Sequence, residues 1–235
     1  MKSPDVDTVM AELRVLAQLL GLADPGERLE CLRPHIAHYA EIAIAPDSLE
    51  LVVGGSPQNL ALQAARLGTA APAIQAFLAC TEHFRCKTVG LKVPFGPGQP
   101  SLYSRLLVPK AEGIDFLSSL VPIQALSERL SEHQILYGLG FMGDPLVIKT
   151  YVLQGQGFVS WRLDPGGLSG EYKEYRANHQ LNAETGSWGA ILQALMAQGF
   201  ETAGHASERF VDGQRVQPKL YFERIGAIPT DWTAR

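Results

Sequence analysis

The sequence predicts an α+β protein in which helices alternate with antiparallel β-hairpins. Gly-Asp at 143–144 and Asp-Gly at 212–213 each separate two strand-like runs. A third pair of runs, 88–94 and 101–109, flanks the Gly-Pro-rich segment FGPGQP. Between the hairpins, apolar residues recur at helical spacing. An antiparallel sheet with helices packed against it accounts for all of these observations.

The N-terminal segment, 1–45, is predicted to be helical. Val9, Leu13, Leu16 and Leu20 are spaced like the buried face of an amphipathic helix. A second helical stretch is expected over 27–44, after the Asp-Pro-Gly turn at 24–26. Pro34 should break or kink it, because proline lacks the amide hydrogen that a helix interior uses.

From 48 to 224 the pattern changes to short strands and helices that read as αββα units of roughly 40 to 50 residues. The expected strands are 48–54, 88–94, 101–109, 134–142, 145–154, 158–163, 207–211 and 216–224. The expected helices are 73–85, 113–120, 123–133 and 187–199. Residues 164–186 have no clear period and are expected to form a loop or an irregular hairpin. Residues 58–67 favour a helix by propensity, although their length also fits a returning strand.

Composition narrows the classes of protein to which the chain can belong. Its 235 residues, 46% of them hydrophobic, suffice for one domain over 1–235 with a full core. The net charge is −4 and the basic residues are scattered, so neither nucleic acid nor a membrane is an expected partner. The three cysteines do not suggest a disulfide framework, and the charged N-terminus is unlike a signal peptide. We therefore expect a cytoplasmic protein.

A Lys-x-Tyr pair occurs in two of the predicted strands, as Lys149-Thr-Tyr151 and Lys219-Leu-Tyr221, and a related Tyr103-Ser-Arg105 occurs in a third. Residues two apart in a strand share one face of the sheet, so each run places a cation beside a phenol. In an open sheet this face would lie in water. If the hairpins close into a barrel, the same residues line its interior and suit an anion such as diphosphate.

These features resemble the soluble aromatic prenyltransferases of the ABBA, or PT-barrel, family. The resemblance rests on the alternation of helices and hairpins, the Lys-x-Tyr pairs and an acid in the early strand DSLELVVGG. It implies an antiparallel β-barrel surrounded by helices, in which an allylic diphosphate donor alkylates an aromatic small molecule or a peptide, in secondary metabolism. It also implies the site: Glu50 as the base that takes the acceptor's proton, and Arg66, Lys92, Tyr103, Arg105, Lys149, Tyr151, Lys219 and Tyr221 as substrate-binding residues. Under it, 58–67 becomes a strand with Arg66 facing inward.

The sequence contains no Asp-Asp-x-x-Asp cluster, so binding of diphosphate is expected to need no cofactor, and magnesium has no dedicated site. Two other readings of the chain stay open. One is a noncatalytic protein that binds a small anion, an isoprenoid or a partner. The other is a metal-dependent enzyme that uses His35, His38 and Glu41; a second set of potential ligands is Cys80, Glu82, His83 and Cys86.

Overall fold

The fold was determined as a computed structural model. It describes residues 5–46, 48–131, 134–154, 157–175, 179–180, 187–197, 199–200, 202–203, 205–211 and 214–225. The chain forms an α+β fold on an antiparallel sheet, as predicted. The described helices are α1 Val6–Leu19, α2 Gly26–Ile36, α3 Pro57–Arg66, α4 Ala71–His83, α5 Lys110–Ser118, α6 Gln124–Arg129 and α7 Ser187–Ala197.

The described strands of the main sheet are β1 Ala40–Ala45, β2 Ser48–Gly54, β3 Thr88–Pro94, β4 Ser101–Pro109, β5 Ile135–Met142, β6 Val147–Gln154, β7 Gly157–Asp164, β8 Gly167–Tyr175, β11 His205–Val211 and β12 Gln214–Ile225. They pair in the order β1-β12-β11-β8-β7-β6-β5-β4-β3-β2. Because β1 pairs with β12 on one side and with β2 on the other, the sheet closes on itself. Two short strands, β9 His179–Gln180 and β10 Thr202–Ala203, pair separately.

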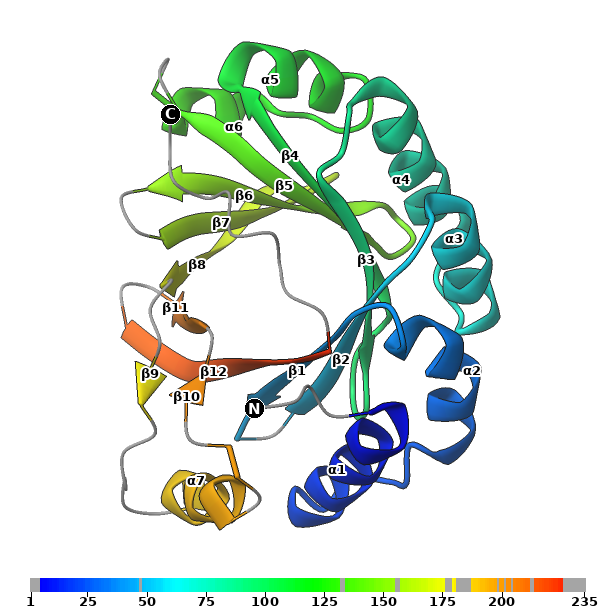
Figure 1. The fold of residues 1–235 in the computed structure, drawn as a ribbon. Helices are drawn as coiled ribbons and strands as arrows, with labels where there is room; N and C mark the ends of the chain where they lie inside the picture. The colour runs from blue at the N-terminus through cyan, green and yellow to red at the C-terminus, as the bar shows by residue number, and fades with distance from the viewer. Residues whose placement is uncertain are drawn as a thin grey trace.

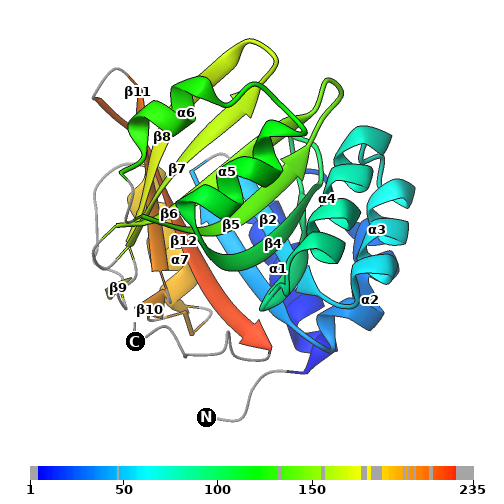
Figure 2. The same cartoon turned by 90° about the horizontal axis from the view of Figure 1, so that it is seen from above.

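The helices lie outside the ring of strands. In Figure 1, α1 to α6 follow the outer side of the sheet in chain order, and Figure 2 shows them lying along the strands. Helices precede the hairpins in pairs: α1 and α2 before β1 and β2, α3 and α4 before β3 and β4, and α5 and α6 before β5 and β6. Strand β7 begins three residues after β6 ends, which leaves no length for a helix at this point. The predicted αββα unit therefore does not repeat evenly around the ring.

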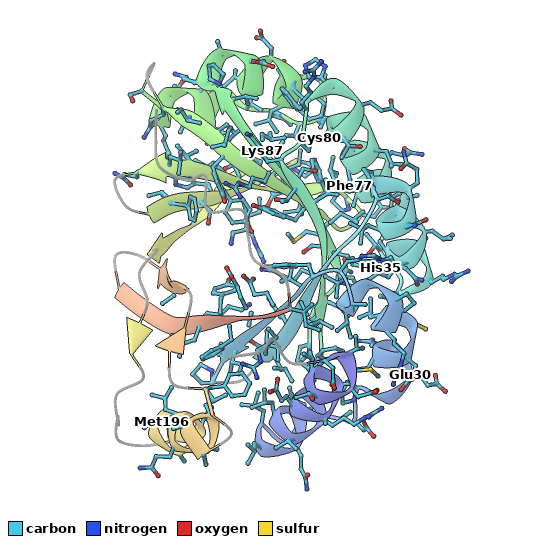
Figure 3. The ribbon with its side chains drawn as sticks, viewed as in Figure 1. Glu30, His35, Phe77, Cys80, Lys87 and Met196 are labelled. Atoms are coloured by element: carbon cyan, nitrogen blue, oxygen red, sulfur yellow. The ribbon has the colours of Figure 1, made fainter. Side chains whose placement is uncertain are left out.

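The main hydrophobic core lies between the helices and the outer face of the strands. Alternate strand residues such as Leu51, Leu91 and Ile148 are fully buried there. On the helix side, Phe77 of α4 packs edge-on against Phe141 of β5, with ring centroids 6.2 Å apart (Figure 3). Since side chains alternate along a strand, the residues between these positions face the interior of the ring.

Two sequence predictions about helices need correction. The stretch 27–44 is not one helix, because α2 ends at Ile36 and residues 40–45 form β1, paired with both β2 and β12. Conversely, 58–67 is helix α3 and not a strand. Ser56 caps its N-terminus by accepting a hydrogen bond from the Asn59 amide, and Pro57 begins the helix. Both local signals favour a helix.

The strand predictions fit better. The hairpin 88–94 with 101–109 is confirmed as β3 and β4 at the same boundaries. Part of 164–186 forms β8, which pairs with β11 and forms a hairpin with β7 that contains a register shift, so of the two forms expected here the irregular hairpin is the one observed for this part. The predicted turn at 212–213 lies outside the described residues, although β11 and β12 on either side of it are paired.

Candidate functional site

Three lysines gather around Glu50 on the inner face of the ring. Leu49 and Leu51 beside it are fully buried on the helix side, so Glu50 points the other way. Its Oε2 atom lies 2.6 Å from Lys219 Nζ, which comes from β12, and 3.5 Å from Lys92 Nζ, which comes from β3. Lys149 of β6 contacts the Tyr151 ring, and its positive charge contributes to lowering the pKa of both Glu50 and Lys219. The strands thus bring together three cations from distant parts of the sequence.

The charges of this cluster perturb one another. Burial disfavours the Glu50 carboxylate, but the positive charges of Lys92, Lys219 and Lys149 outweigh burial and lower the pKa of Glu50 to about 2. Burial also lowers the pKa of Lys219 to about 8, and the neighbouring lysines add to this shift while Glu50 opposes it. The cluster is therefore a carboxylate firmly held in its charged form beside an ammonium group that releases its proton more easily than usual.

Solvent reaches the cluster despite its position inside the ring. The side chains of Lys92, Glu50 and Lys219 keep 21%, 17% and 19% of their surface exposed. In the fully buried outer core, the exposed fraction of residues such as Leu51 is zero. Figure 3 also shows side chains from opposite sides of the ring pointing toward its centre. Part of each side chain is therefore open to solvent, although the Glu50 Oε2 atom itself is buried.

Tyrosine rings lie against the lysines. Lys149 Nζ is 4.5 Å from the centre of the Tyr151 ring, and Lys92 Nζ is 5.4 Å from the centre of the Tyr221 ring. Tyr103 of β4 meets Tyr151 edge-on, with ring centroids 5.7 Å apart. The negative face of a phenol ring attracts a cation. The same rings that now contact ammonium groups could therefore stabilise a carbocation formed beside them.

Glycines make room for these rings. Tyr103 is flanked by Gly90 on β3 and by Gly140 on β5, and Tyr151 pairs with Gly138. A Cβ atom on Gly138 would lie 2.9 Å from the Ser104 carbonyl oxygen and 3.1 Å from the Tyr103 ring. The glycines opposite the two tyrosines therefore leave space on the inner face that larger side chains would fill.

Arg66 lies apart from the lysine cluster, whereas Arg105 lies beside an aromatic cluster that includes Tyr151. Arg105 is buried on β4, and its guanidinium carbon is 5.1 Å from the centre of the Tyr137 ring. Tyr137 in turn packs against Phe158, so Arg105 lies beside an aromatic cluster of the inner face. Arg66 is exposed at the end of helix α3. Its predicted position inside the barrel is wrong, because 58–67 is a helix on the outside.

Glu41, expected on a helix as a metal ligand with His35 and His38, lies instead on the inner face of β1. Glu41 of β1 is 5% exposed and accepts a hydrogen bond of 3.2 Å from the Tyr39 hydroxyl. Burial raises the pKa of Tyr39, and the charges of Glu41 and Glu223 raise it further. Glu223 is the cross-strand neighbour of Glu41 on β12. The run AEIAIA at 40–45 alternates polar and apolar residues as a strand does, but its alanines also favour a helix.

The two histidine-containing clusters do not form metal sites in the described part of the chain. His35 is buried in α2, where burial lowers its pKa, whereas Glu41 lies on a strand. Among the described residues no group of three or more His, Cys, Asp and Glu side chains is arranged to hold a metal ion. The metal-dependent alternative therefore has no ligand set among these residues.

No protein-family model matches the chain, and no curated protein matches it in sequence. Within the described residues, no helix is both long and apolar enough to cross a membrane.

Proposed function

We propose that the protein is a prenyltransferase that moves an allylic prenyl group from its diphosphate to an aromatic or related nucleophilic acceptor. The observation that carries this proposal is the meeting of Lys92, Lys149 and Lys219 on the inner face of the sheet. Lys92 and Lys219 lie against the Glu50 carboxylate and the charge of Lys149 also acts on it, and ammonium groups gathered in this way suit the charge of a diphosphate group. Under the proposal, the fold is an ABBA-type barrel with an abbreviated set of helices.

The chemistry follows from the positions of the charges and the rings. The carbon–oxygen bond of the allylic diphosphate breaks, and the lysines take up the negative charge of the leaving diphosphate. Tyr151 and Tyr221, which already lie against Lys149 and Lys92, would flank the allylic cation. The acceptor then forms a carbon–carbon or carbon–heteroatom bond with the cation, and the proton it loses passes to the released diphosphate. No step in this sequence requires a metal ion, and magnesium would only assist the departure of diphosphate.

Glu50 fits a positioning role better than the role of general base that the resemblance to the prenyltransferases implies. A base is most effective when its pKa is near the working pH, whereas the pKa of Glu50 is about 2. Its contacts with Lys219 and Lys92 instead hold two ammonium groups on the same side of the interior. In the proposal, Glu50 orients the lysines that bind diphosphate.

The proposal is tested by incubating the protein with dimethylallyl or geranyl diphosphate and a panel of indoles, phenols and tyrosine-containing peptides. Mass spectrometry then reports whether an acceptor gains the mass of a prenyl group. In parallel, unfolding is followed with each diphosphate, since a ligand at about a hundred times its dissociation constant should stabilise the protein by roughly 2.7 kcal/mol. Stabilisation without product in the whole panel would favour the noncatalytic binding protein.

Two variants make the test specific. Lys149→Ala should abolish stabilisation by diphosphates and leave the fold intact, because Lys149 belongs to the inner cluster and not to the outer core. Lys87→Ala is the matched control, since Lys87 is an exposed lysine just before β3 (Figure 3). Equal loss in both variants, or no loss in either, would contradict the proposed binding site.

A further inference from the structure

Two cysteines on the outer side of the sheet lie in contact with each other. Cys80 belongs to helix α4, which packs against β4 and β5, and its side chain is fully buried. Cys86 follows six positions later, just before β3, and is half-buried at the edge of the same core. A hydrogen bond joins the two thiols, and no disulfide is formed between them. The third cysteine, Cys31 of α2, is exposed.

The course of the chain holds the two sulfur atoms together. At the end of α4, the Phe84 amide donates a hydrogen bond of 3.0 Å to the Cys80 carbonyl oxygen. The chain then turns, since the Cys86 amide donates to the Phe84 carbonyl oxygen at 3.0 Å. The Lys87 amide next donates to the Arg105 carbonyl oxygen at 2.8 Å and so fixes this segment to β4. In Figure 3, Cys80 and Lys87 accordingly lie close together.

A buried hydroxyl group faces both thiols. Ser104 of β4 is fully buried, and its side chain lies within hydrogen-bonding reach of Cys80 and of Cys86. Apart from these sulfur atoms, its Oγ atom has no hydrogen-bond partner in the part of the chain that the structure describes. The Cys80 thiol lowers the pKa of Cys86, with help from Ser104 and against the effect of burial. The hydrogen bond to Cys86 and burial raise the pKa of Cys80. The more exposed sulfur is thus the one that forms a thiolate more readily.

We propose that Cys80 and Cys86 form a reversible oxidation site that reacts with peroxides and closes to an intramolecular disulfide. The Cys86 sulfur attacks one oxygen of hydrogen peroxide, the oxygen–oxygen bond breaks, and a sulfenic acid forms. The other oxygen leaves as hydroxide and becomes water with the proton that Cys86 released. The Cys80 sulfur then attacks the sulfenic sulfur, and a second water leaves with the Cys80 proton. Two thiols are oxidised, and one peroxide is reduced to two waters.

The arrangement suits a disulfide that forms and breaks without a change of fold. The sulfur atoms must approach from hydrogen-bonding contact to about 2.05 Å, which rotation of the two side chains can supply. The bond would tie the end of α4 to the start of β3 on the outer side of the sheet. It lies on the opposite face from the lysines, so the site stands whether or not the protein transfers prenyl groups.

The test exposes the reduced protein to hydrogen peroxide, blocks the remaining thiols with iodoacetamide and maps tryptic peptides by mass spectrometry without reduction. Because trypsin cleaves after Arg85, a disulfide between Cys80 and Cys86 joins two otherwise separate peptides. We expect this joined product, and dithiothreitol should restore both thiols. Before oxidation, iodoacetamide should label Cys86 at least about ten times faster than Cys80. Oxidation that pairs Cys31 instead, or that leaves Cys80 and Cys86 as thiols, would overturn the proposal.

Three variants complete the experiment. Cys86→Ser should abolish the disulfide, and its half-buried position makes the change compatible with folding. Cys80→Ala leaves the sulfenic acid of Cys86 without its partner, so dimedone should trap more of it than in the wild type. Cys31→Ser is the matched control, because it removes the exposed cysteine and should leave the disulfide unchanged. Loss of the disulfide in Cys31→Ser, or no gain of dimedone adduct in Cys80→Ala, would contradict the proposal. Should Cys80→Ala fail to fold, the other two variants decide.

Discussion

Glu50→Gln keeps the shape of the side chain and removes the negative charge that the three lysines share. In the wild type, the pKa of Glu50 is lowered from its ordinary value to about 2, despite burial. A change of one pKa unit corresponds to about 1.4 kcal/mol, so the charged form contributes about 3 kcal/mol to stability at neutral pH. We expect the variant to lose roughly this amount, less whatever is regained when Lys219 gives up its proton.

The dependence on pH gives the prediction a second, independent test. A group whose pKa is depressed in the folded state adds stability above its unfolded pKa, and this stability is lost as the pH falls toward the folded value. For Glu50 the contribution is therefore complete above about pH 4.5 and disappears as the pH falls toward about 2. The difference between wild type and Glu50→Gln should be constant from pH 5 to 7 and should shrink below that range.

The assay is urea-induced unfolding of both proteins, with and without inorganic diphosphate. Because the anion supplies the negative charge that the variant lacks, it should stabilise Glu50→Gln more than the wild type. Glu30→Gln is the matched control. Glu30 also contacts two cations, Arg14 and Arg33, but it lies on the exposed face of α2, where an ion pair contributes about 1 kcal/mol at most. Equal stability of wild type and Glu50→Gln at pH 7 would refute the charge argument.

Three further predictions concern a glycine of the inner face, an ion pair between helix α1 and strand β12, and a residue of the outer core. Gly138→Ala should destabilise the protein by roughly 1 to 3 kcal/mol, since the new methyl group would lie 2.9 Å from the backbone of the sheet. Gly140→Ala should destabilise it less, because the nearest new contact is 3.5 Å away. Thermal unfolding of both variants compares the two effects. Arg224→Met should lower the free energy of unfolding by about 3 kcal/mol, because Arg224 of β12 forms an ion pair with Glu12 of α1. Without Arg224, the Glu12 carboxylate would be left almost buried and without its partner. Glu12→Gln, measured in the same way, should lower the free energy of unfolding by less. Ile148→Ala should cost roughly 2 to 5 kcal/mol in urea unfolding, because Ile148 is fully buried, whereas its neighbour Lys149 can be changed to alanine with little loss of stability.

Local signals predicted most of the secondary structure. The turn FGPGQP fixed the hairpin of β3 and β4 to the residue, because glycine and proline admit few other conformations there. Propensity alone favoured a helix over 58–67, whereas the resemblance to a family implied a strand; in the structure Ser56 caps helix α3 and Pro57 begins it. Where a strong cap and a general resemblance disagree, the cap is here the better guide.

Other elements depend on partners that are far away in the sequence. The run AEIAIA has residues that suit a helix, yet it forms β1 because β2 and β12 offer hydrogen bonds on both sides. Strand β8 is rich in charge and glycine, and it is a strand because it lies between β7 and β11. Such strands are specified by tertiary context, which outweighs propensity in sheets.

The lysine cluster was predictable in its residues but not in its geometry. Alternation along strands indicated that Lys149 and Lys219 share a face with their tyrosines. The alternation did not reveal that the Glu50 carboxylate would contact both Lys219 and Lys92, because these three residues come from β2, β12 and β3. Glu41 was assigned to a helix as a potential metal ligand, because its place on the inner face depends on the pairing of β1 with β2 and β12.

The division between the two faces of the sheet explains how this chain can hold a charged group inside without losing stability. The outer face carries the fully buried apolar residues that pack on the helices, and it supplies most of the hydrophobic free energy. The inner face carries charges that keep about a fifth of their surface exposed, so it contributes far less apolar burial. Because successive residues of one strand serve the two faces in turn, Ile148 and Lys149 can be altered separately. Substitutions on the inner face can therefore change which ligand the sheet binds, while the apolar residues of the outer face keep the fold stable.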